Sequence, residues 1–446
     1  MMKGRISFVC QECGYDSPQW LGKCPECSTW NSLREIQISN VRSQMSNVKG
    51  VRQNIEPKRL DQIKFQKKQR LLTGFSELDG VLGGGIVKGS AILLAGDPGI
   101  GKSTLLLQIA LKMAAEKEKV LYISGEESEE QIKLRADRIN PKASKPKAHS
   151  NLLLISNTNT DLVCGTIQKI NPILVIVDSI QTMESENVAG LSGSVGQVRY
   201  GASQFIKLAK TLGIPVIMVG HVTKEGMVAG PMVLSHMVDA VLFLEGEKFT
   251  RTRILRSLKN RFGPVDEIGL FAMENEGVKE LNNPEQLFLS KTNNNPVSGS
   301  ILSVTMEGTR VFLIEIQALV VTSKIPIPRR VASGIDYKRL ELLLAVLQKH
   351  CNIPLSGMDV FVNVAGGIKL SDPGTDLSIC LAIISSFQNI KLSNKVGIGE
   401  IGLLGEIRRA NSLEKRIKEA QKLGFKDVLS SNKFKTLKDV MLSLNK

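Results

Sequence analysis

Residues 89–104, GSAILLAGDPGIGKST, place two glycines, a lysine and a hydroxyl at the spacing G-x-x-x-x-G-K-[ST]. In this pattern the glycines let backbone N–H groups turn toward phosphate oxygens, while the lysine reaches the outer oxygens and the hydroxyl ligates Mg²⁺. An apolar strand precedes the turn and a helical apolar period follows it, which is the context this chemistry needs. We therefore predict a site for ATP and Mg²⁺, with contacts from Gly96, Asp97, Pro98, Gly99, Ile100, Gly101, Lys102, Ser103 and Thr104.

Carboxylates follow two of the apolar runs further along the chain. The runs VLYISGEES, LLLIS, ILVIVDSI and PVIMVGH alternate with helical patterns, which predicts an α/β fold: a parallel sheet with helices on both faces and ligands beyond the carboxyl ends of its strands. At these ends Asp178 is expected to hold the Mg²⁺ shell and Glu126 to orient the attacking water. Capping of a helix N-terminus is the alternative role for either position, and Glu127 suits that role.

Two further segments of this region carry polar groups that are candidates for binding. Residues 186–203, rich in Gly and Ser, include Arg199 and are typical of a mobile binding loop or of a plain surface loop. His221, Thr223 and Lys224 follow the run PVIMVG, where a polar group is placed to sense the γ-phosphate. A purely structural histidine is the equal alternative.

Four cysteines stand close together near the N-terminus. Cys10, Cys13, Cys24 and Cys27 form two C-x-x-C pairs separated by ten residues. Two such turns supply the tetrahedral thiolate set that Zn²⁺ favours, and four protein ligands leave no position for a substrate. We predict a structural zinc module over residues 1–30, whose folding and metal binding are one event. A redox dithiol pair is the alternative.

Size and charge limit the classes of function. A chain of 446 residues predicts several domains. Lys and Arg total 58 against 43 Asp and Glu, a net charge of +15 that favours phosphate-rich partners. There is neither a run of 18 apolar residues nor an N-terminal signal pattern, so we expect a cytoplasmic protein without membrane segments. Cys164, Cys351 and Cys380 fall in apolar patterns and are expected to be buried thiols, and residues 31–68 are expected to form a basic linker.

Several motifs together resemble a known family. LTGFSELDGVLGGGIVKGS before the phosphate loop, SGEES after the second strand and GHVTKEGMVAGP after the fourth resemble RecA-like ATPases. With the four-cysteine module and KNRFG at 259–263, the chain resembles the RadA (Sms) family of bacterial DNA repair proteins nearly end to end. The resemblance implies a RecA-like, doubly wound, mostly parallel sheet over residues 69–283, preceded by a zinc-ribbon-like module.

The same resemblance implies a function. It implies that the chain is a DNA-dependent ATPase of homologous recombination and DNA damage repair. Such an enzyme would drive branch migration together with the RecA recombinase. The implied partners are single-stranded and branched DNA and further copies of the chain in a ring of six subunits. A regulatory ATP-binding ring scaffold without motor activity is one alternative, and an ATP-dependent peptidase is another.

The KNRFG motif comprises Lys259, Asn260, Arg261, Phe262 and Gly263. From the residues alone it is typical of a basic hairpin end. The resemblance implies instead that it handles DNA or contacts the nucleotide of a neighbouring subunit, for which the rigid guanidinium of Arg261 and the compact cation of Lys259 are suited.

Residues 284–446 resemble the α+β fold of Lon-type peptidases. The turn DPGTD has Gly374 where those enzymes carry the nucleophilic serine, and their lysine falls at Glu414 or at the adjacent Lys415. Because glycine cannot attack a carbonyl, we expect no peptidase activity, with Ser371 and Ser378 as the nearest substitutes.

Without a peptidase activity, the last domain is expected to act as a ring scaffold. It also carries cations that could face DNA or be ordinary surface charges. These are Lys369, Arg408, Arg409 and Lys418.

Overall fold

The computed structural model describes residues 5–10, 16–25, 30–38, 70–116, 118–139, 150–221, 234–246, 251–281, 297–367 and 369–444. The chain forms two compact units. The first holds residues up to 245 with 255–265 and 273–279, and the second holds 246–254, 266–272 and 280–446. The predicted boundaries at residues 68 and 283 lie outside the described residues. Among the described helices, none is long and apolar enough to span a bilayer.

A three-stranded antiparallel sheet forms near the N-terminus, in the order β2-β1-β3. Its strands are β1 (Arg5–Cys10), β2 (Asp16–Ser17) and β3 (Leu33–Ile38). Strand β3 pairs with β1 along its whole length, so the module continues past residue 30, where we expected a linker to begin. The strand is not evident in the sequence LREIQI, because among its first residues only Leu33 enters the core and no clear alternation results. The rest of the expected linker, from residue 39, lies outside the described residues.

The larger sheet of the described residues has nine strands, in the order β12-β11-β10-β9-β4-β8-β7-β5-β6. The pairs from β9 through β6 are all parallel, which confirms the predicted α/β class with a large parallel sheet. The strands are β4 (Ala91–Gly96), β5 (Val120–Ser124), β6 (Leu152–Ser156), β7 (Leu174–Asp178), β8 (Val216–His221), β9 (Ala240–Glu245), β10 (Thr252–Asn260), β11 (Ile268–Glu274) and β12 (Gly277–Glu280).

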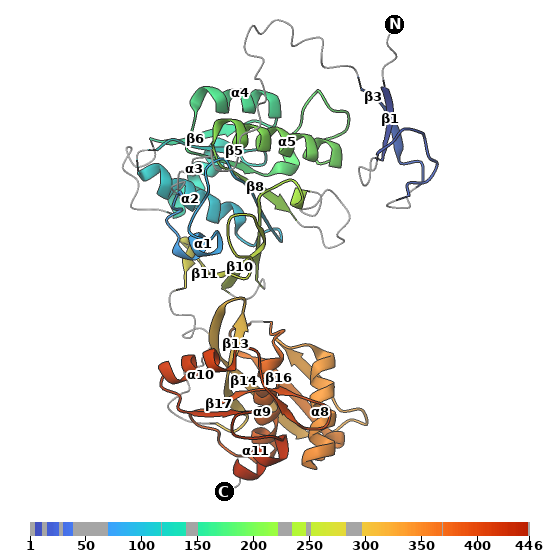
Figure 1. Ribbon diagram of the computed structural model, residues 1–446, viewed down its shortest axis with the longest axis vertical. Helices are drawn as coiled ribbons and strands as arrows, with labels where there is room; N and C mark the ends of the chain where they lie inside the picture. The colour runs from blue at the N-terminus through green and yellow to red at the C-terminus, as the bar shows by residue number, and fades with distance from the viewer. Residues whose placement is uncertain are drawn as a thin grey trace, which may run out of the picture. The chain divides into compact units, whose positions relative to one another are not determined.

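Helices cover both faces of this sheet (Figure 1). They are α1 (Ser76–Val81), α2 (Lys102–Ala115), α3 (Glu129–Ile139), α4 (Thr160–Ile170) and α5 (Val195–Leu212). Every residue of β4, β5 and β7 is buried because both of their faces are packed, which is why their sequences read as continuous apolar runs. The parallel order places the carboxyl ends of β4, β5, β7 and β8 along one edge of the sheet.

The segment 186–203 differs from the mobile loop that its Gly and Ser content indicated. Helix α5 begins at Val195, so half of the segment is helical. The buried side chain of Gln197 donates to the carbonyls of Ser185, Val188 and Gly190 and accepts from the Ser185 amide. One side chain therefore holds the remaining loop in place, and Arg199 is exposed on the helix.

The second unit contains a six-stranded mixed sheet in the order β15-β16-β14-β13-β17-β20. Its strands are β13 (Ser300–Glu307), β14 (Arg310–Thr322), β15 (Arg330–Ser333), β16 (Met358–Val364), β17 (Lys395–Ile398) and β20 (Asp427–Ser430), with a separate ribbon of β18 (Glu400–Ile401) and β19 (Ile407–Arg408). The pairs β13–β14 and β14–β16 are antiparallel, whereas β15–β16, β13–β17 and β17–β20 are parallel.

Four helices pack on this sheet: α8 (Tyr337–Cys351), α9 (Asp376–Gln388), α10 (Leu413–Lys422) and α11 (Leu437–Leu444). Alternate residues of β13 and β14 face two separate cores. Ile301 and Ile314 pack with α8, α9 and α11, while Leu302 and Leu313 pack with α10. The expected thiols Cys351 and Cys380 lie buried in the first of these cores.

The turn at Gly374 is closed by a buried ion pair. Arg416 of α10 is 2% exposed; it pairs with Asp372 and donates to the carbonyls of Val304 (2.7 Å) and Asn411 (2.8 Å). A Cβ atom on Gly374 would lie 2.9 Å from Arg416 Nη1 and 3.0 Å from Asp372 Oδ1. The space for a side chain at this position is thus taken by an ion pair.

We expect Arg416→Met to loosen α10, because it leaves the Asp372 carboxylate in a buried site without its cation. Removing one partner of a buried pair costs about 3–5 kcal/mol. Native-state hydrogen exchange of the α10 amides should therefore accelerate by at least about 100-fold, whereas the matched variant Lys418→Met, exposed on the same helix, should leave it nearly unchanged. Equal exchange in the two variants would contradict this role for the ion pair.

Candidate functional site

The phosphate loop joins the end of β4 to the start of α2 through glycines with positive φ. The φ values are 151° at Gly96, 77° at Gly99 and 111° at Gly101. A Cβ atom on Gly96 would lie 2.3 Å from the carbonyl oxygen of Leu244, so no other residue fits there. By contrast, a Cβ atom on Gly99 would meet no atom within 4 Å. The loop is therefore wrapped tightly onto the sheet at one end and open in the middle, where a phosphate chain would lie.

Lys102, the first residue of α2, points back into the loop. Its side chain is 3% exposed, and Nζ donates to the carbonyls of Gly96 (2.8 Å) and Asp97 (2.9 Å). Burial lowers the pKa of Lys102, and the negative charges of Asp178, Asp97 and Glu126 oppose that shift. Because both hydrogen bonds of this ammonium go to backbone carbonyls, it can exchange them for phosphate oxygens.

Asp178, the last residue of β7, meets Ser103 of α2. Ser103 Oγ donates to Asp178 Oδ1 at 3.1 Å, and the hydroxyl of Tyr122 on β5 donates to Asp178 Oδ2. Burial, reinforced by the Asp178 carboxylate, raises the pKa of Tyr122 well above its usual range, so the phenol stays a donor. Ser103 and Asp178 thus present hard oxygen atoms side by side, as a Mg²⁺ site requires.

Glu126 lies beyond the end of β5 with its carboxylate half exposed. Its Oε1 accepts a hydrogen bond from Ser179 Oγ at 2.7 Å and lies 3.4 Å from Nε2 of His221, the last residue of β8. The structure therefore brings Glu126 and His221 together at the same sheet edge as Lys102. Thr223 and Lys224 lie outside the described residues.

The neighbouring Glu127 does not cap the helix that follows it. It forms an ion pair with Arg135 of α3. The start of α3 is closed instead by Ser128 and Gln131, which exchange hydrogen bonds in the pattern of a capping box. Helix capping, which we predicted as the alternative role of Glu127, is therefore performed by Ser128.

The motif at 259–263 sits where β10 ends, beside the beginning of β9. Lys259 Nζ donates to the carbonyls of Ser235 (2.7 Å) and Val238 (2.8 Å), so this cation braces the turn that leads into β9. Arg261 lies differently: its amide donates to the Asp239 carbonyl at 3.0 Å, while its guanidinium is 57% exposed and 3.6 Å from the Asp239 carboxylate. Arg261 alone in the motif presents an exposed charge.

The other motif residues are tied to the chain that precedes β4. Arg70 donates to the carbonyl of Phe262 at 2.7 Å and to that of Leu82 at 2.9 Å. Gly263 packs against the backbone of Gly83, and a Cβ atom on it would come within 3.1 Å of Gly83 Cα. Asn260 Oδ1 accepts from the Phe262 amide, which closes the turn.

The motif and the phosphate loop lie at opposite ends of one strand. Asp239 bonds with both backbone groups of Ala91, the first residue of β4, whereas the phosphate loop opens at Gly96, the last. At about 3.3 Å per residue these ends are roughly 17 Å apart. Arg261 therefore faces the edge opposite to the nucleotide site of its own chain.

Cys10 and Cys24, one from each C-x-x-C pair, are both buried in a single cluster with Leu33. Cys10 Sγ lies 3.2 Å from Ser32 Oγ. Cys13 and Cys27 lie outside the described residues. One buried sulfur from each pair in a single cluster fits a shared metal centre of the kind that Zn²⁺ occupies.

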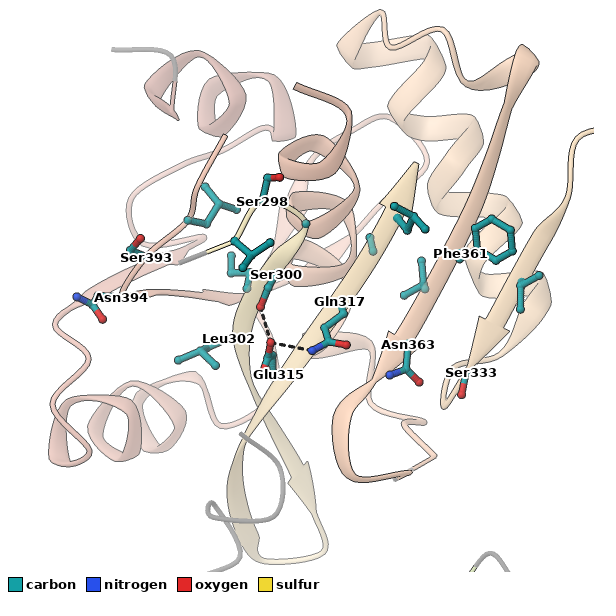
Figure 2. A pocket seen from close by; sticks show the side chains of 18 of the residues that line it. Ser298, Ser300, Leu302, Glu315, Gln317, Ser333, Phe361, Asn363, Ser393 and Asn394 are labelled. Atoms are coloured by element: carbon teal, nitrogen blue, oxygen red, sulfur yellow. Dashed lines mark hydrogen bonds between the residues drawn. The ribbon is translucent and has the colours of Figure 1, made fainter. Parts of the chain in front are cut away.

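A cavity of about 660 Å³ opens on the second unit's sheet, lined by residues of β13, β14, β15 and β16 (Figure 2). Ser300, Gln317, Asn363 and Ser333 form a row across four paired strands, and Ser300 and Gln317 both donate to Glu315. Among its described lining residues, Glu315 has the only ionisable side chain. The described residues that line the cavity therefore include no lysine or histidine that could act as a base for a serine.

The residues expected near a peptidase centre are also placed. Ser378 is buried and donates to the carbonyls of Leu302 and Gly397, and Ser371 is exposed. Glu414 pairs with Arg409, and Lys415 bonds to the Thr309 carbonyl, so neither faces Gly374 as Arg416 does. Of the cations considered for DNA, Arg408 also pairs with Glu406, and Lys369 and Lys418 are exposed.

Three supporting residues escaped the sequence analysis: Tyr122, Ser179 and Asp239. Tyr122 and Asp239 are buried polar groups that orient Asp178 and anchor Arg261. A weak signal existed for Tyr122, a phenol inside the fully apolar run VLYIS, because a buried phenol needs a partner.

Comparisons with known proteins show which proteins this chain resembles. A family model described as an AAA domain matches residues 56–227, and one described as a rubredoxin metal binding domain matches residues 8–35. DNA repair protein RadA of Bacillus subtilis (strain 168) is 46% identical over 434 residues, covering 96% of this chain and 93% of the relative. DNA repair protein RadA of Listeria monocytogenes is 43% identical over 446 residues, covering 99% and 96%.

Among solved structures, a crystal structure of the RadB recombinase covers 48% of this chain and 100% of its own, with 25% identity and a TM-score of 0.38. A KaiC-like protein of Pyrococcus horikoshii covers 48% of this chain and 99% of its own, with 18% identity and a TM-score of 0.39.

We expect Tyr122→Phe to slow ATP hydrolysis about 10-fold at saturating ATP and Mg²⁺, because losing a hydrogen bond to a carboxylate costs at least about 1.4 kcal/mol. The matched control is Tyr200→Phe. Tyr200 donates to Asp161 at 2.9 Å on the surface of α5, so its loss should leave the steady-state rate unchanged. Equal rates for the two variants would show that Tyr122 does not position Asp178.

Proposed function

The chain belongs to the RadA family of DNA repair proteins, and from this premise we propose that it is a DNA-dependent ATPase that processes recombination intermediates. It would act on single-stranded and branched DNA as a ring of six subunits, driving branch migration with the RecA recombinase after DNA damage. The observation that carries the proposal is the meeting of Lys102, Ser103, Asp178 and Glu126 at one sheet edge.

In this proposal each residue at the edge has a distinct task. The loop amides and Lys102 bind the phosphate chain, and Lys102 gives up its carbonyl partners as it does so. Ser103 and Asp178 would hold Mg²⁺, whose positive charge would offset the charge of the phosphate oxygens. Glu126 accepts a proton from the attacking water, with Ser179 fixing its carboxylate. His221, in contact with Glu126, would sense the γ-phosphate.

Arg261 supplies the contact with a second molecule. Its guanidinium is exposed at the edge away from its own nucleotide, so the phosphate that it meets comes from DNA or from a neighbouring subunit. Lys259 has a supporting role, because its ammonium donates hydrogen bonds to backbone carbonyls. We propose that Arg261 carries the activity of the motif and that the other four residues hold it in position.

The last domain, proposed to be Lon-peptidase-like, would act as a ring scaffold without peptidase activity. Gly374 supplies no nucleophile, and Arg416 with Asp372 fills the space beside it. An acyl intermediate therefore has no residue on which to form there. The zinc module would keep a structural metal through its four cysteines.

We expect single-stranded DNA to stimulate ATP hydrolysis by the full-length protein. Lys102→Ala should abolish hydrolysis with and without DNA, since the loop loses the cation that binds the outer phosphate oxygens. Arg261→Ala should keep the basal rate within about 2-fold if Arg261 contacts DNA, and should lose the stimulation. Steady-state phosphate release with oligonucleotides across a salt series measures both rates. ATP binding without any DNA-dependent hydrolysis would support the regulatory scaffold instead.

Mixed assemblies distinguish the two sources of phosphate for Arg261. If Arg261 serves a neighbouring subunit's nucleotide, Arg261→Ala alone should lose most basal hydrolysis. Mixing it with inactive Lys102→Ala should then restore part of the DNA-free rate, because intact Arg261 and intact Lys102 meet across some interfaces. An equal mixture of Arg261→Ala with wild type is the control for dilution. No gain over the sum of the two variants would exclude this contact.

A further inference from the structure

The only two tryptophans of the chain, Trp20 and Trp30, both lie in the N-terminal module and both are exposed. Their exposed fractions are 54% and 70%, which is unusual for the largest apolar side chain. Neither ring belongs to the core of the module, which is formed by Cys10, Cys24 and Leu33 with Phe8 and Leu21 against them. The rings are therefore not there to stabilise the module.

The two rings converge over one backbone position. A Cβ atom on Gly22 would lie 3.6 Å from Trp20 Cη2 and 4.0 Å from Trp30 Cζ3. Both indoles therefore lie close to the same backbone position.

The backbone holds this arrangement before any ligand arrives. Lys23 and Trp30 form an antiparallel bridge, and the amide of Asn31 donates to the Gly22 carbonyl at 2.7 Å. Asn31 itself has a positive φ of 54°, which directs the chain after Trp30. Because the two segments are tied together, little ordering entropy is lost when a ligand meets both rings.

We propose that Trp20 and Trp30 form a stacking platform for unpaired bases of single-stranded DNA, with Lys23 meeting the adjacent phosphate. Lys23 Nζ lies over the Trp30 ring, 5.7 Å from its centre, so a cation already accompanies this aromatic side chain. Aromatic side chains next to a cation are the usual means of binding single strands without sequence preference. The inference rests on the proposed function, because it supplies a second DNA contact to the same protein.

The surroundings of the rings favour a nucleobase over an apolar protein partner. The side chains of Gln19, Lys23 and Asn31 are exposed around the two rings. Within the described part of the module, Trp20 and Trp30 are the only exposed large hydrophobic residues, so no aliphatic rim extends the patch. Two aromatic rings bordered by polar groups match the π-face and polar edges of a base.

The chain carries its own reporter for this site. Because both tryptophans are in the platform, the intrinsic tryptophan emission of the full-length natural protein reports on it alone. Oligo(dT) should quench this emission saturably, with the midpoint found for the same oligonucleotide by fluorescence anisotropy. A duplex of equal length should quench it far less, since its bases are already stacked and paired.

Substitution provides the second readout. Trp30→Ala should weaken binding of oligo(dT) by about 5- to 150-fold, the range that corresponds to one base–aromatic stack of roughly 1–3 kcal/mol. Trp30→Tyr should recover most of the affinity, because a phenol ring also stacks. Bound zinc, measured for each variant, and the DNA-free ATPase rate should equal those of wild type.

The proposal is overturned if oligo(dT) binds to saturation while the tryptophan emission and the affinity of Trp30→Ala stay at their wild-type values. The same result in these DNA measurements is expected if the two rings bind a protein partner instead of DNA. That outcome leaves the proposed ATPase function standing, provided that DNA still stimulates hydrolysis. Failure of DNA to bind at all, with the emission unchanged, would instead contradict both this inference and the proposed function.

Discussion

The structure of the first unit depends on how one strand is held at its two ends. Strand β4 starts at Ala91, whose backbone is bonded to Asp239 in both directions, and ends at Gly96, where the phosphate loop begins. Gly96 is pressed so closely against the Leu244 carbonyl that no Cβ fits. Since β9 carries Asp239 just before its first residue and Leu244 near its last, the pairing of β4 with β9 fixes both functional ends of the sheet.

Most of the charged side chains around Asp239 position other groups. The buried Asp239 carboxylate pairs with Lys210 of α5, bonds the Ala91 amide and lies near Arg261. From the sequence, Lys259 and Arg261 are equivalent candidates. In the structure Lys259 instead donates hydrogen bonds to backbone carbonyls, and burial lowers the pKa of its ammonium. Most residues of the 259–263 motif therefore hold one exposed guanidinium, that of Arg261, in position. At the other edge, Tyr122 and Ser103 serve the same purpose for Asp178.

Much of this could be predicted from the sequence because it rests on local patterns. The glycine loop, the apolar strands and the carboxylates at their ends are each encoded within a few neighbouring residues, and the structure places them along one edge. Strand β3 was missed because its alternation is weak, and helix α5 was partly missed because Gly and Ser outweighed its helical period. The role of Gln197 in closing that loop depends on bonds that composition does not reveal.

Long-range partners could not be predicted, since nothing in a sequence links residues that are far apart. Arg416 is the clearest case: its period with Leu413 and Ala420 marks a buried helix face, yet only the fold shows that it meets Asp372 at Gly374. The bond from Arg70 to Phe262 joins residues 192 positions apart. Such contacts decide which cations of a basic chain remain available for a polyanion, and here they leave Arg261 rather than Lys259.

We propose that occupancy of the phosphate loop and the affinity for DNA are coupled through this sheet. The most direct test measures the affinity of the full-length protein for one single-stranded oligonucleotide, at fixed salt, with ADP and with a non-hydrolysable ATP analogue. The account predicts affinities that differ by at least about 10-fold, and an equal factor when the affinity of either nucleotide is measured with and without DNA. Identical DNA affinities in the two nucleotide states would contradict it.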